Sequence, residues 1–344
     1  MATSEGPFRE FGTPGLVGGS FRLQTPPTAW MKPAVSVSGL VKAYGPVRAV
    51  DGVSFEVEPG QVFALLGPNG AGKTTTIEIL EGFRGRDAGE VRVLDIDPGD
   101  RRSGQRLRSQ LGVVLQELAV EPFLSVRQVL ERSAGFYPAP RPVSEVIDLI
   151  GLAEKADAKV KTLSGGQQRR LDVGLGIVGN PALLILDEPT TGLDPAGRRM
   201  SWELVRTLAA DGTTVILTTH YMEEAEALAD QVAIIAGGKI VADGPPESLG
   251  GRDRGGATIR FRLPADVTLA DLPMAASVDG QAAEVRTDQE VEVLYELTKW
   301  ALEHEVRITG LTVSRRTLED IYLQLTGTGP ERLQGESASP ASVR

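Results

Sequence analysis

Cysteine is absent from the 344-residue sequence. Its absence excludes a disulfide framework, a thiolate metal site and a cysteine nucleophile, and it fits a cytoplasmic protein. Long apolar runs are missing as well, because no stretch approaches the roughly 20 consecutive apolar residues that a membrane-spanning helix requires. The most apolar segments, "ALLILDEP" and "QVAIIAGG", are short and predict buried strands. If the protein acts at a membrane, another component must hold it there.

Positive charge is also in short supply. The chain has 36 Lys and Arg against 46 Asp and Glu, for a net charge of −10. This balance argues against general nucleic-acid binding, because such proteins use cations to displace counterions from phosphates. With 41% hydrophobic and 24% charged residues, the composition is otherwise that of an ordinary soluble globular protein. The N-terminus carries Glu5, Arg9 and Glu10 without an apolar segment, so we expect no signal peptide.

Composition and periodicity divide the chain into four parts. Residues 1–33, rich in Gly, Pro, Ser and Thr, predict a disordered or loosely packed extension, and residues 328–344 predict a disordered tail. Residues 34–250 alternate apolar strands with helical segments, which is typical of a parallel-sheet α/β core. Two amphipathic segments within about 117–170 predict a helical lobe inserted into that core. After the linker-like "GGRDRGG", residues 256–327 predict a small α+β domain that ends in a helix.

The segment "GPNGAGKTT" follows an apolar strand and precedes a helical segment. It fits the phosphate-loop pattern, in which Gly67 and Gly72 let the backbone curl so that successive N–H groups point at phosphates. Lys73 would neutralise the β- and γ-phosphates, and the Thr74 hydroxyl would bind Mg²⁺. A chance Gly-rich turn does not explain the strand and the helix that flank the loop. The expected nucleotide contacts also include Pro68, Asn69, Gly70, Ala71 and Thr75.

Two later strands end in polar side chains. Asp187 and Glu188 close the apolar run "LLILDEP", which places them at the carboxyl end of a buried strand, where α/β sheets bind ligands. We expect Asp187 to hold Mg²⁺ and Glu188 to act as general base on the attacking water, with a solvated acidic turn as the alternative. His220 ends "TTVILTTH" and is expected to sense the γ-phosphate, although a lone histidine is more often structural.

The order of these motifs resembles the nucleotide-binding subunit of ATP-binding cassette (ABC) transporters over about residues 35–250. The motifs are the phosphate loop, "LSGGQ" at residues 163–167, "LLILDEP", "TGLDP" at residues 191–195 and the strand-end histidine, and "LSGGQ" followed by "QRR" is the most specific of them. It implies a P-loop NTPase fold, with a mixed sheet and an inserted helical lobe, that binds ATP and Mg²⁺ and hydrolyses ATP.

The resemblance also implies that two copies of the chain pair head to tail. Each ATP would be sandwiched between the phosphate loop of one copy and the "LSGGQ" signature of the other. This explains why one chain carries two Gly-rich anion cradles, each leading into a helix. The residues that would contact the partner's ATP are Ser164, Gly165, Gly166 and Gln167.

Three further residues take their roles from the family's motifs. Gln116, which ends "VVLQ", matches the glutamine that contacts Mg²⁺ and water and borders the helical lobe. Asp194 matches the aspartate along the dimer interface, and it is also a natural N-cap for a helix starting at Pro195. Tyr44 in "KAYG" matches the aromatic residue that stacks on adenine, with a core or turn tyrosine as the alternative.

Within that family the sequence resembles the ATP-binding subunits of multidrug and antibiotic exporters of the daunorubicin/doxorubicin-resistance type. "GPNGAGKTTTIEIL", "THYMEEAEALAD" and the C-terminal "RRTLEDIYLQLTG" carry this resemblance. It implies drug efflux or antibiotic resistance through a separate transmembrane permease, with the subunit held at the cytoplasmic face of the membrane. A short permease helix would dock beside Gln116, in the lobe that includes Phe123 and Leu124. The lobe segment "SAGFYPAPRPVSEV" is shorter and richer in proline than in many members.

Two other functional classes compete with this interpretation. A soluble ABC ATPase of translation or DNA repair would work without a permease, but such chains commonly carry two cassettes and favour basic surfaces. A phosphate-loop kinase or GTPase would leave "LSGGQ" without a purpose. The sequence therefore favours the ATPase subunit of an exporter that has no nucleic-acid partner. It does not identify the exported compound, because the permease would hold the cargo pocket.

Overall fold

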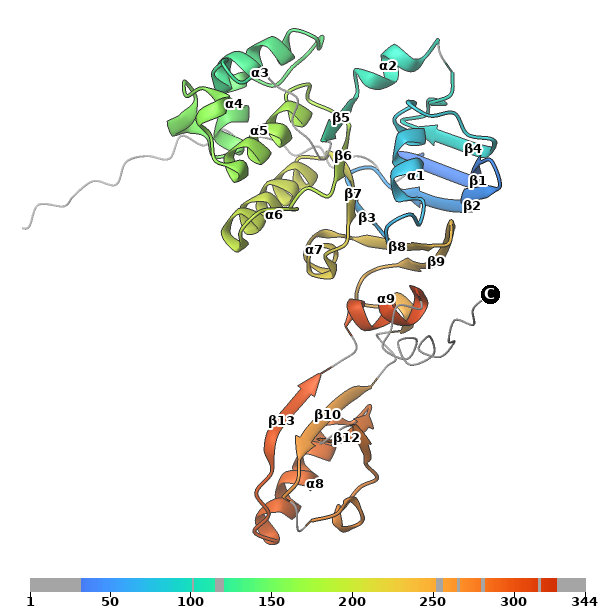
Figure 1. Ribbon diagram of the computed structural model, residues 1–344, viewed down its shortest axis with the longest axis vertical. Coiled ribbons are helices and arrows are strands. Elements are labelled where there is room, and N and C mark those ends of the chain that lie inside the picture. The colour runs from blue at the N-terminus through green and yellow to red at the C-terminus, as the bar shows by residue number, and fades with distance from the viewer. Residues whose placement is uncertain are drawn as a thin grey trace, which may run out of the picture. The chain divides into compact units, whose positions relative to one another are not determined.

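The computed structural model describes residues 32–100, 102–114, 121–251, 256–264, 267–279, 282–314 and 317–326 (Figure 1). The expected tail at 328–344 lies outside these ranges, and so does the expected N-terminal extension apart from residues 32 and 33. Gln116 also lies outside the described residues, so the structure does not place it. None of the helices within the described ranges is both long enough and apolar enough to cross a membrane.

The larger part of the chain is built on a mixed sheet with the strand order β5-β6-β7-β3-β8-β9. Its strands are β3 (Val62–Leu66), β5 (Leu111–Val114), β6 (Leu183–Asp187), β7 (Thr214–Thr219), β8 (Gln231–Ala236) and β9 (Lys239–Gly244). The first five strands in that order run parallel, and β9 pairs antiparallel to β8. Every residue of β3 is buried, which explains why this strand is an uninterrupted apolar run in the sequence.

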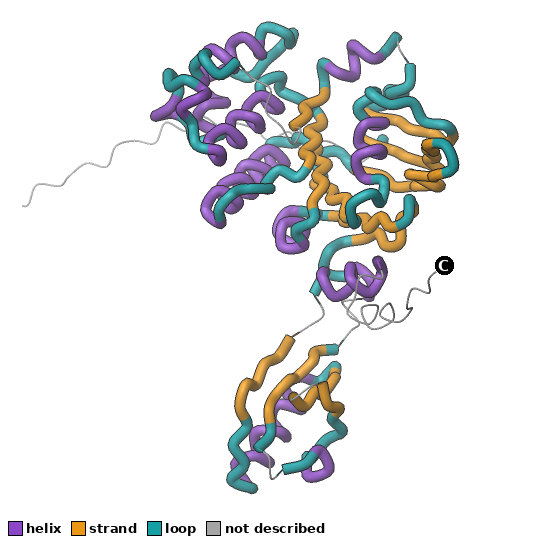
Figure 2. Tube along the Cα trace, viewed as in Figure 1, coloured by secondary structure: helices purple, strands orange, loops and turns teal. Residues whose placement is uncertain are grey.

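A second sheet is antiparallel and has the order β2-β1-β4 (Figure 2). Its strands are β1 (Val35–Tyr44), β2 (Val47–Val57) and β4 (Ala88–Val93). One buried cluster joins this sheet to helix α1 (Lys73–Leu80) and to the central sheet. Within the cluster the rings of Phe55 and Phe63 stack with their centroids 4.9 Å apart. The short helix α2 (Gly104–Arg108) leads from β4 to β5.

Helices pack on the opposite face of the central sheet. Val62, Ala64 and Leu66 of β3 belong to this second buried cluster, whereas Phe63 and Leu65 belong to the first, as the two-residue period of a strand requires. The helices are α3 (Val126–Ala134), α4 (Val143–Leu149), α5 (Gly165–Ile177), α6 (Pro195–Ala210) and α7 (Met222–Leu228). The first three form the helical lobe, shown in green in Figure 1.

The small domain combines an antiparallel sheet of the order β11-β12-β10-β13 with one helix. Its elements are β10 (Ala257–Arg262), β11 (Ser277–Asp279), β12 (Ala282–Thr287), α8 (Glu290–Glu303) and β13 (Thr309–Ser314). Ile259 and Phe261 of β10 are buried together with Leu297 and Trp300 of α8. The domain therefore has a hydrophobic core of its own, and the expected α+β composition is observed.

Helix α9 (Leu318–Thr326) packs against the α/β core and not within the small-domain cluster. Leu318 is fully buried in the cluster of the central sheet, and its backbone N–H donates to Glu226 Oε1 at 3.0 Å. The Ile321 side chain lies against Gly250. The sequence predicts this helix at the end of the small domain, 256–327. Its apolar residues recur three and four positions apart and bury against α7 and β8 instead.

Candidate active site

The phosphate loop joins β3 to α1 and lines a pocket of about 260 Å³. The loop residues that line it are Pro68, Asn69, Gly70, Gly72, Lys73, Thr74 and Thr75. Ala49, Asp187 and Glu188 complete the lining. The structure thus brings the expected loop and the expected carboxylates to one cavity. Ala71, also expected to contact nucleotide, is instead buried in the hydrophobic cluster beneath the loop.

Two glycines of the motif are required by the geometry of the loop. A Cβ atom at Gly67 would lie 2.4 Å from the carbonyl oxygen of Ile235. Gly72 has a φ of +111°, and a Cβ atom there would lie 2.4 Å from the carbonyl oxygen of Ala49. Any other residue at either position would therefore push the loop away from the neighbouring backbone.

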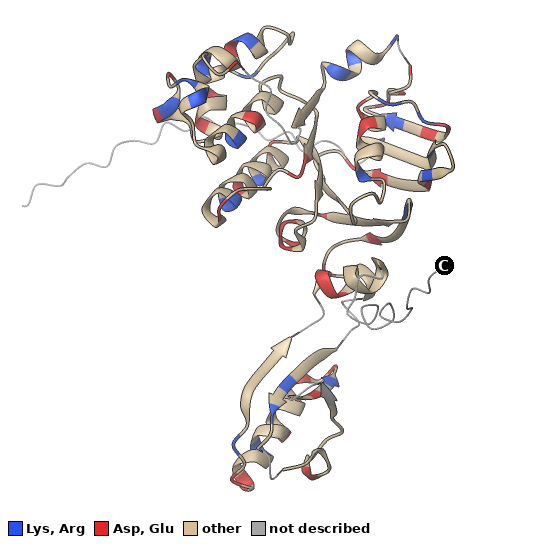
Figure 3. Ribbon diagram, in the orientation of Figure 1, with Lys and Arg blue, Asp and Glu red and all other residues tan. Residues whose placement is uncertain are grey.

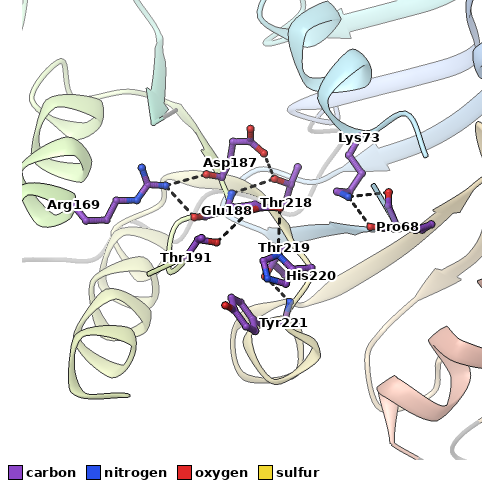
Figure 4. A network of polar contacts seen from close by, with 11 residues as sticks. Pro68, Lys73, Arg169, Asp187, Glu188, Thr191, Thr218, Thr219, His220 and Tyr221 are labelled. Carbon is purple, nitrogen blue, oxygen red and sulfur yellow. Dashed lines mark hydrogen bonds and ion pairs between the residues drawn. The ribbon is translucent and has the colours of Figure 1, made fainter. Parts of the chain in front are cut away.

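Lys73 begins α1 and is 8% exposed (Figure 4). Its ammonium group donates to the carbonyl oxygens of Gly67 at 2.6 Å and Pro68 at 3.2 Å, which folds the side chain back over the loop. Burial lowers the pKa of Lys73, and the negative charges of Glu188 and Asp187 oppose that shift. The ammonium group therefore lies where an anion in the pocket would meet it, at the positive end of a helix.

Thr218 of the adjacent strand contacts both Asp187 and Glu188 at the end of β6. Asp187 Oδ1 accepts a short hydrogen bond from the Thr218 hydroxyl of the adjacent strand β7. Glu188 has a φ of +48°, and its backbone N–H donates to the Thr218 carbonyl oxygen at 3.0 Å. Positive φ is uncommon for a residue with a side chain and marks a tight turn. This turn lets both consecutive side chains line the same pocket.

His220 lies next to Glu188 although 31 residues separate them in sequence. Its Nδ1 is 3.3 Å from Glu188 Oε1, while the Thr191 hydroxyl donates to the other carboxylate oxygen at 3.2 Å. The imidazole is 44% exposed and packs against the Tyr221 ring at a centroid distance of 4.1 Å. The sequence predicts His220 and Glu188 at the ends of strands of the same sheet, and the structure brings them into contact (Figure 4).

A divalent cation fits the donors that meet in the pocket. Thr74 and Asp187 both line it, and hydroxyl and carboxylate oxygens are ligands that Mg²⁺ accepts. Among the described residues, no cluster of three or more His, Cys, Asp or Glu forms a complete metal cage. This composition suits Mg²⁺, which usually takes one or two protein ligands and fills its shell with phosphate and water.

Arg169 of α5 is a buried residue to which the sequence analysis gave no role. Its guanidinium group donates to the carbonyl oxygens of Asp187 and Glu188, both at 3.0 Å, and of Pro189 at 3.1 Å. It lies 3.8 Å from the carboxylate of Asp172, whose pKa burial raises to about 7. Arg169 therefore ties the signature helix to the turn that carries both pocket carboxylates.

The signature motif is built as a helix start. The Ser164 hydroxyl accepts from the Gln167 N–H at 3.3 Å, and Gln167 Oε1 accepts from the Ser164 N–H at 2.9 Å, which completes a capping box on α5. A Cβ atom at Gly165 would meet nothing within 4 Å, and one at Gly166 would meet only Leu193, at 3.6 Å. This open helix N-terminus contributes none of the described residues that line the phosphate-loop pocket.

Asp194 and Tyr44 are the remaining expected contacts. Asp194 Oδ1 accepts from the Gly197 N–H at 2.7 Å and caps α6, with Pro195 at the first helical position, as its alternative role requires. Tyr44 ends β1, is 42% exposed and lies 5.3 Å from the Arg84 guanidinium and 5.8 Å from the Lys42 ammonium group. Its ring is available for stacking but is not part of the pocket lining.

Comparison with known proteins connects this geometry to named families. A family model described as "ABC transporter" matches residues 50–191, and one for the C-terminal domain of ABC-transporter-like proteins matches residues 257–317. The second match ends just before α9, in agreement with the packing of that helix.

The curated relatives match nearly the whole chain. The Nod factor export ATP-binding protein I of Ralstonia nicotianae is 38% identical, over 86% of this chain and 94% of its own length. The daunorubicin/doxorubicin resistance ATP-binding protein DrrA of Streptomyces peucetius is 36% identical, over 89% of this chain and 96% of its own length. Among solved structures, cbiO1 from Clostridium perfringens, part of the ABC transporter complex cbiONQ, has a TM-score of 0.57 at 28% identity. It covers 63% of this chain and 90% of its own.

Proposed function

Because this chain belongs to the ABC transporter family of ATP-binding subunits, we propose that it couples ATP hydrolysis to export through a separate transmembrane permease. ATP binding and hydrolysis follow from the family. Export of a drug, an antibiotic or another small amphipathic compound is supported by the names of the relatives, which refer to Nod factor export and to resistance to daunorubicin and doxorubicin.

The pocket supports in-line attack of water on the γ-phosphate. We assign Lys73 and the loop amides to the β- and γ-phosphates, and Glu188 to the polarisation of the attacking water. His220, 3.3 Å from Glu188, would contact the γ-phosphate and orient that carboxylate. Mg²⁺ held by Thr74 and Asp187 would neutralise charge that develops on the phosphate oxygens. Catalysis then rests on positioning and electrostatics, as in other phosphoryl transfers.

The observation that carries a dimeric mechanism is the separation of the two anion cradles. Ser164, Gly165 and Gly166 present an open helix N-terminus, yet they do not line the phosphate-loop pocket of their own chain. A second copy placed head to tail would complete each pocket with the signature of its partner. Closure would then depend on ATP, and hydrolysis would release it.

A groove in the helical lobe supports docking of a permease. Its volume is about 480 Å³, and its lining includes Leu124, Val129, Phe136 and Leu175. Phe123, which precedes Leu124 in the sequence, is 66% exposed. The Lys161 ammonium group lies 4.7 Å from the centre of the Phe123 ring. We propose that a short cytoplasmic helix of the permease packs its apolar side here, which would hold the subunit at the cytoplasmic face of the membrane.

The experiment that tests the proposal is size-exclusion chromatography of Glu188→Gln with and without Mg²⁺-ATP. This variant keeps the shape of the side chain but removes the general base, so we expect ATP to bind, to turn over very slowly and to accumulate a dimer. Turnover at the wild-type rate would contradict the assigned role of Glu188. A monomer under both conditions would contradict spontaneous pairing, and co-expression with a candidate permease, such as a membrane protein found to be encoded beside this chain, would then test whether a permease is needed.

A further inference from the structure

A basic groove lies between α2 and the turn that follows α3, outside the nucleotide site. Its volume is about 880 Å³, and its lining includes Arg102, Arg106 and Arg108 on one side and Phe136 and Tyr137 on the other. All three arginine side chains are exposed. The buried residues of α2 are Gly104 and Leu107, so the helix anchors by its apolar side and presents Arg106 and Arg108 outward. Figure 3 shows the blue of Lys and Arg on this helix.

The local charge runs against that of the whole chain. Residues 99–110 contain four arginines and one aspartate, whereas the chain carries a net charge of −10. The carboxylate of that aspartate, Asp100, accepts hydrogen bonds from the backbone N–H of Arg102 at 3.0 Å and from the Ser103 hydroxyl at 2.8 Å. No ion pair within the described ranges engages the guanidinium groups of Arg102, Arg106 or Arg108. Within the described residues, the groove therefore carries a local excess of positive charge, which Asp95 and Asp100 offset only by electrostatic attraction to Arg106 and Arg102 without forming ion pairs with them.

An exposed aromatic ring joins this groove to the apolar groove of the helical lobe. Phe136 lines both grooves and is 79% exposed. Arg132, in the lining of the apolar groove, pairs with Glu121 at 3.4 Å, so the excess positive charge is confined to the α2 side. The surface thus combines an apolar groove, a protruding ring and a cluster of arginines.

We propose that the α2 groove binds the headgroups of anionic phospholipids at the membrane surface. Arginines beside an exposed aromatic ring suit the boundary between headgroups and acyl chains, where guanidinium groups bind phosphate and rings enter the interface. The net negative charge of the rest of the chain would repel the same surface, so only this side would approach it. The assignment rests on the proposed work at a membrane, because it shares Phe136 with the groove proposed for the permease.

The α2 groove would orient the subunit at the membrane before the subunit meets its permease. Each Arg near an anionic surface contributes a modest attraction that falls off within a Debye length, so three together give weak, salt-sensitive and reversible binding. A subunit bound in this way would diffuse toward the permease in the plane of the membrane. Its apolar groove would then face the membrane in which the permease lies.

The test is co-sedimentation of the full-length protein with vesicles of phosphatidylcholine alone and with phosphatidylglycerol added. We expect preferential binding to the anionic vesicles, loss of that binding at high salt, and roughly 100-fold weaker partitioning of the triple variant Arg102→Gln, Arg106→Gln, Arg108→Gln. The matched control, Arg262→Gln, Lys299→Gln, Arg307→Gln, removes the same charge from exposed residues of the small domain and should bind as the wild type does.

Equal binding to neutral and anionic vesicles, or equal loss in both triple variants, would overturn the proposal. Binding to soluble polyglutamate but not to vesicles would also overturn it, in favour of an acidic protein segment. ATP turnover without vesicles is measured on the same samples. The α2 variant should retain it, whereas a wild type without turnover would contradict the proposed function and leave the vesicle result standing by itself.

Discussion

Glu81 and Arg169 are both ionisable residues in the interior, and they differ in how fully their polar atoms are hydrogen-bonded. The guanidinium group of Arg169 donates hydrogen bonds to three backbone carbonyl oxygens and lies beside the Asp172 carboxylate. Glu81, 3% exposed at the end of α1, has an Oε1 atom with no hydrogen-bond partner in the described part of the chain. Burial, with the nearby charges of Asp187 and Glu78, raises the pKa of Glu81 to about 7.

This shift predicts the pH dependence of stability. The carboxyl of Glu81 has its ordinary pKa of 4.5 in the unfolded state, so the folded state holds the proton more tightly. The stability that the protonated Glu81 contributes is therefore fully present below about pH 4.5. It is lost as the pH rises to about 7. Glu81→Gln stays neutral throughout. We expect its free energy of unfolding to exceed that of the wild type by up to about 3 kcal/mol at pH 8, with a much smaller difference at pH 5.

Urea unfolding of both proteins at a series of pH values measures this effect. Glu203→Gln, at an exposed position on α6, is the matched control and should follow the wild type at every pH. Wild-type and Glu81→Gln curves that stay parallel between pH 5 and pH 8 would show that Glu81 is ionised in the folded state as readily as in the unfolded one.

Single residues also mark the limit of what could be predicted from the sequence. Lys73, Thr74, Asp187 and Glu188 were assigned to one pocket because strand ends and helix starts meet at one edge of a parallel sheet. Arg169 was missed, although it shares a helix face with Asp172, Val173 and Gly176, all buried. A charged pair on an otherwise apolar face was the available signal. Its partners are backbone carbonyls of a distant turn, which no sequence pattern identifies.

At the scale of elements, the N-terminus of α5 has one observed role, a capping box, and one proposed role, contact with a partner's ATP. The family resemblance implies that Ser164 and Gln167 contact a partner's ATP, and in the structure both side chains form a capping box. The two roles are compatible, because the capping box satisfies N–H groups at Ser164 and Gln167 and leaves Gly165 and Gly166 open. The cap would hold the helix start in shape to receive an anion.

The composite site predicts complementation between two inactive variants. Ser164→Arg should block the signature, and Lys73→Ala should disable the phosphate loop, so neither protein alone should hydrolyse ATP. In a mixed dimer, the intact phosphate loop of the first variant meets the intact signature of the second. We expect ATP turnover to reappear on mixing, up to about a quarter of the wild-type rate if half of the dimers are mixed and each has one working site.

A phosphate-release assay across mixing ratios measures this recovery, and nucleotide binding by the Ser164→Arg monomer serves as the control for its folding. Full activity of Ser164→Arg alone would remove the signature from the site. Two inactive proteins that stay inactive when mixed, while dimers form, would show that turnover requires both sites at once or that each site lies within one chain.

At the scale of the whole molecule, α9 packs on the ATP-binding core although it follows the small domain in sequence. Leu318 is fully buried among residues of the central sheet and its helices, so Leu318→Ala should create a cavity there. We expect the core to lose about 2–5 kcal/mol of stability. Trp300→Ala makes a comparable deletion in the separate core of the small domain.

Differential scanning calorimetry with and without ATP distinguishes the two cores, because the nucleotide raises the transition of the core that binds it. Leu318→Ala should lower the ATP-sensitive transition, and Trp300→Ala should lower the other one. A Leu318→Ala protein whose ATP-sensitive transition is unchanged would show that α9 is not part of the core that binds ATP.

The same helix sets the order in which the protein can finish folding as it is made. Once residues up to 251 have left the ribosome, every strand of the central sheet is available to fold. The apolar surface of α7 and β8 is still uncovered at that point, because Leu318 has not yet been synthesised. The whole small domain, β10 to β13, must be synthesised before that surface is covered. We therefore expect the nascent core to expose this apolar surface until residues 318–326 have left the ribosome and α9 can cover it.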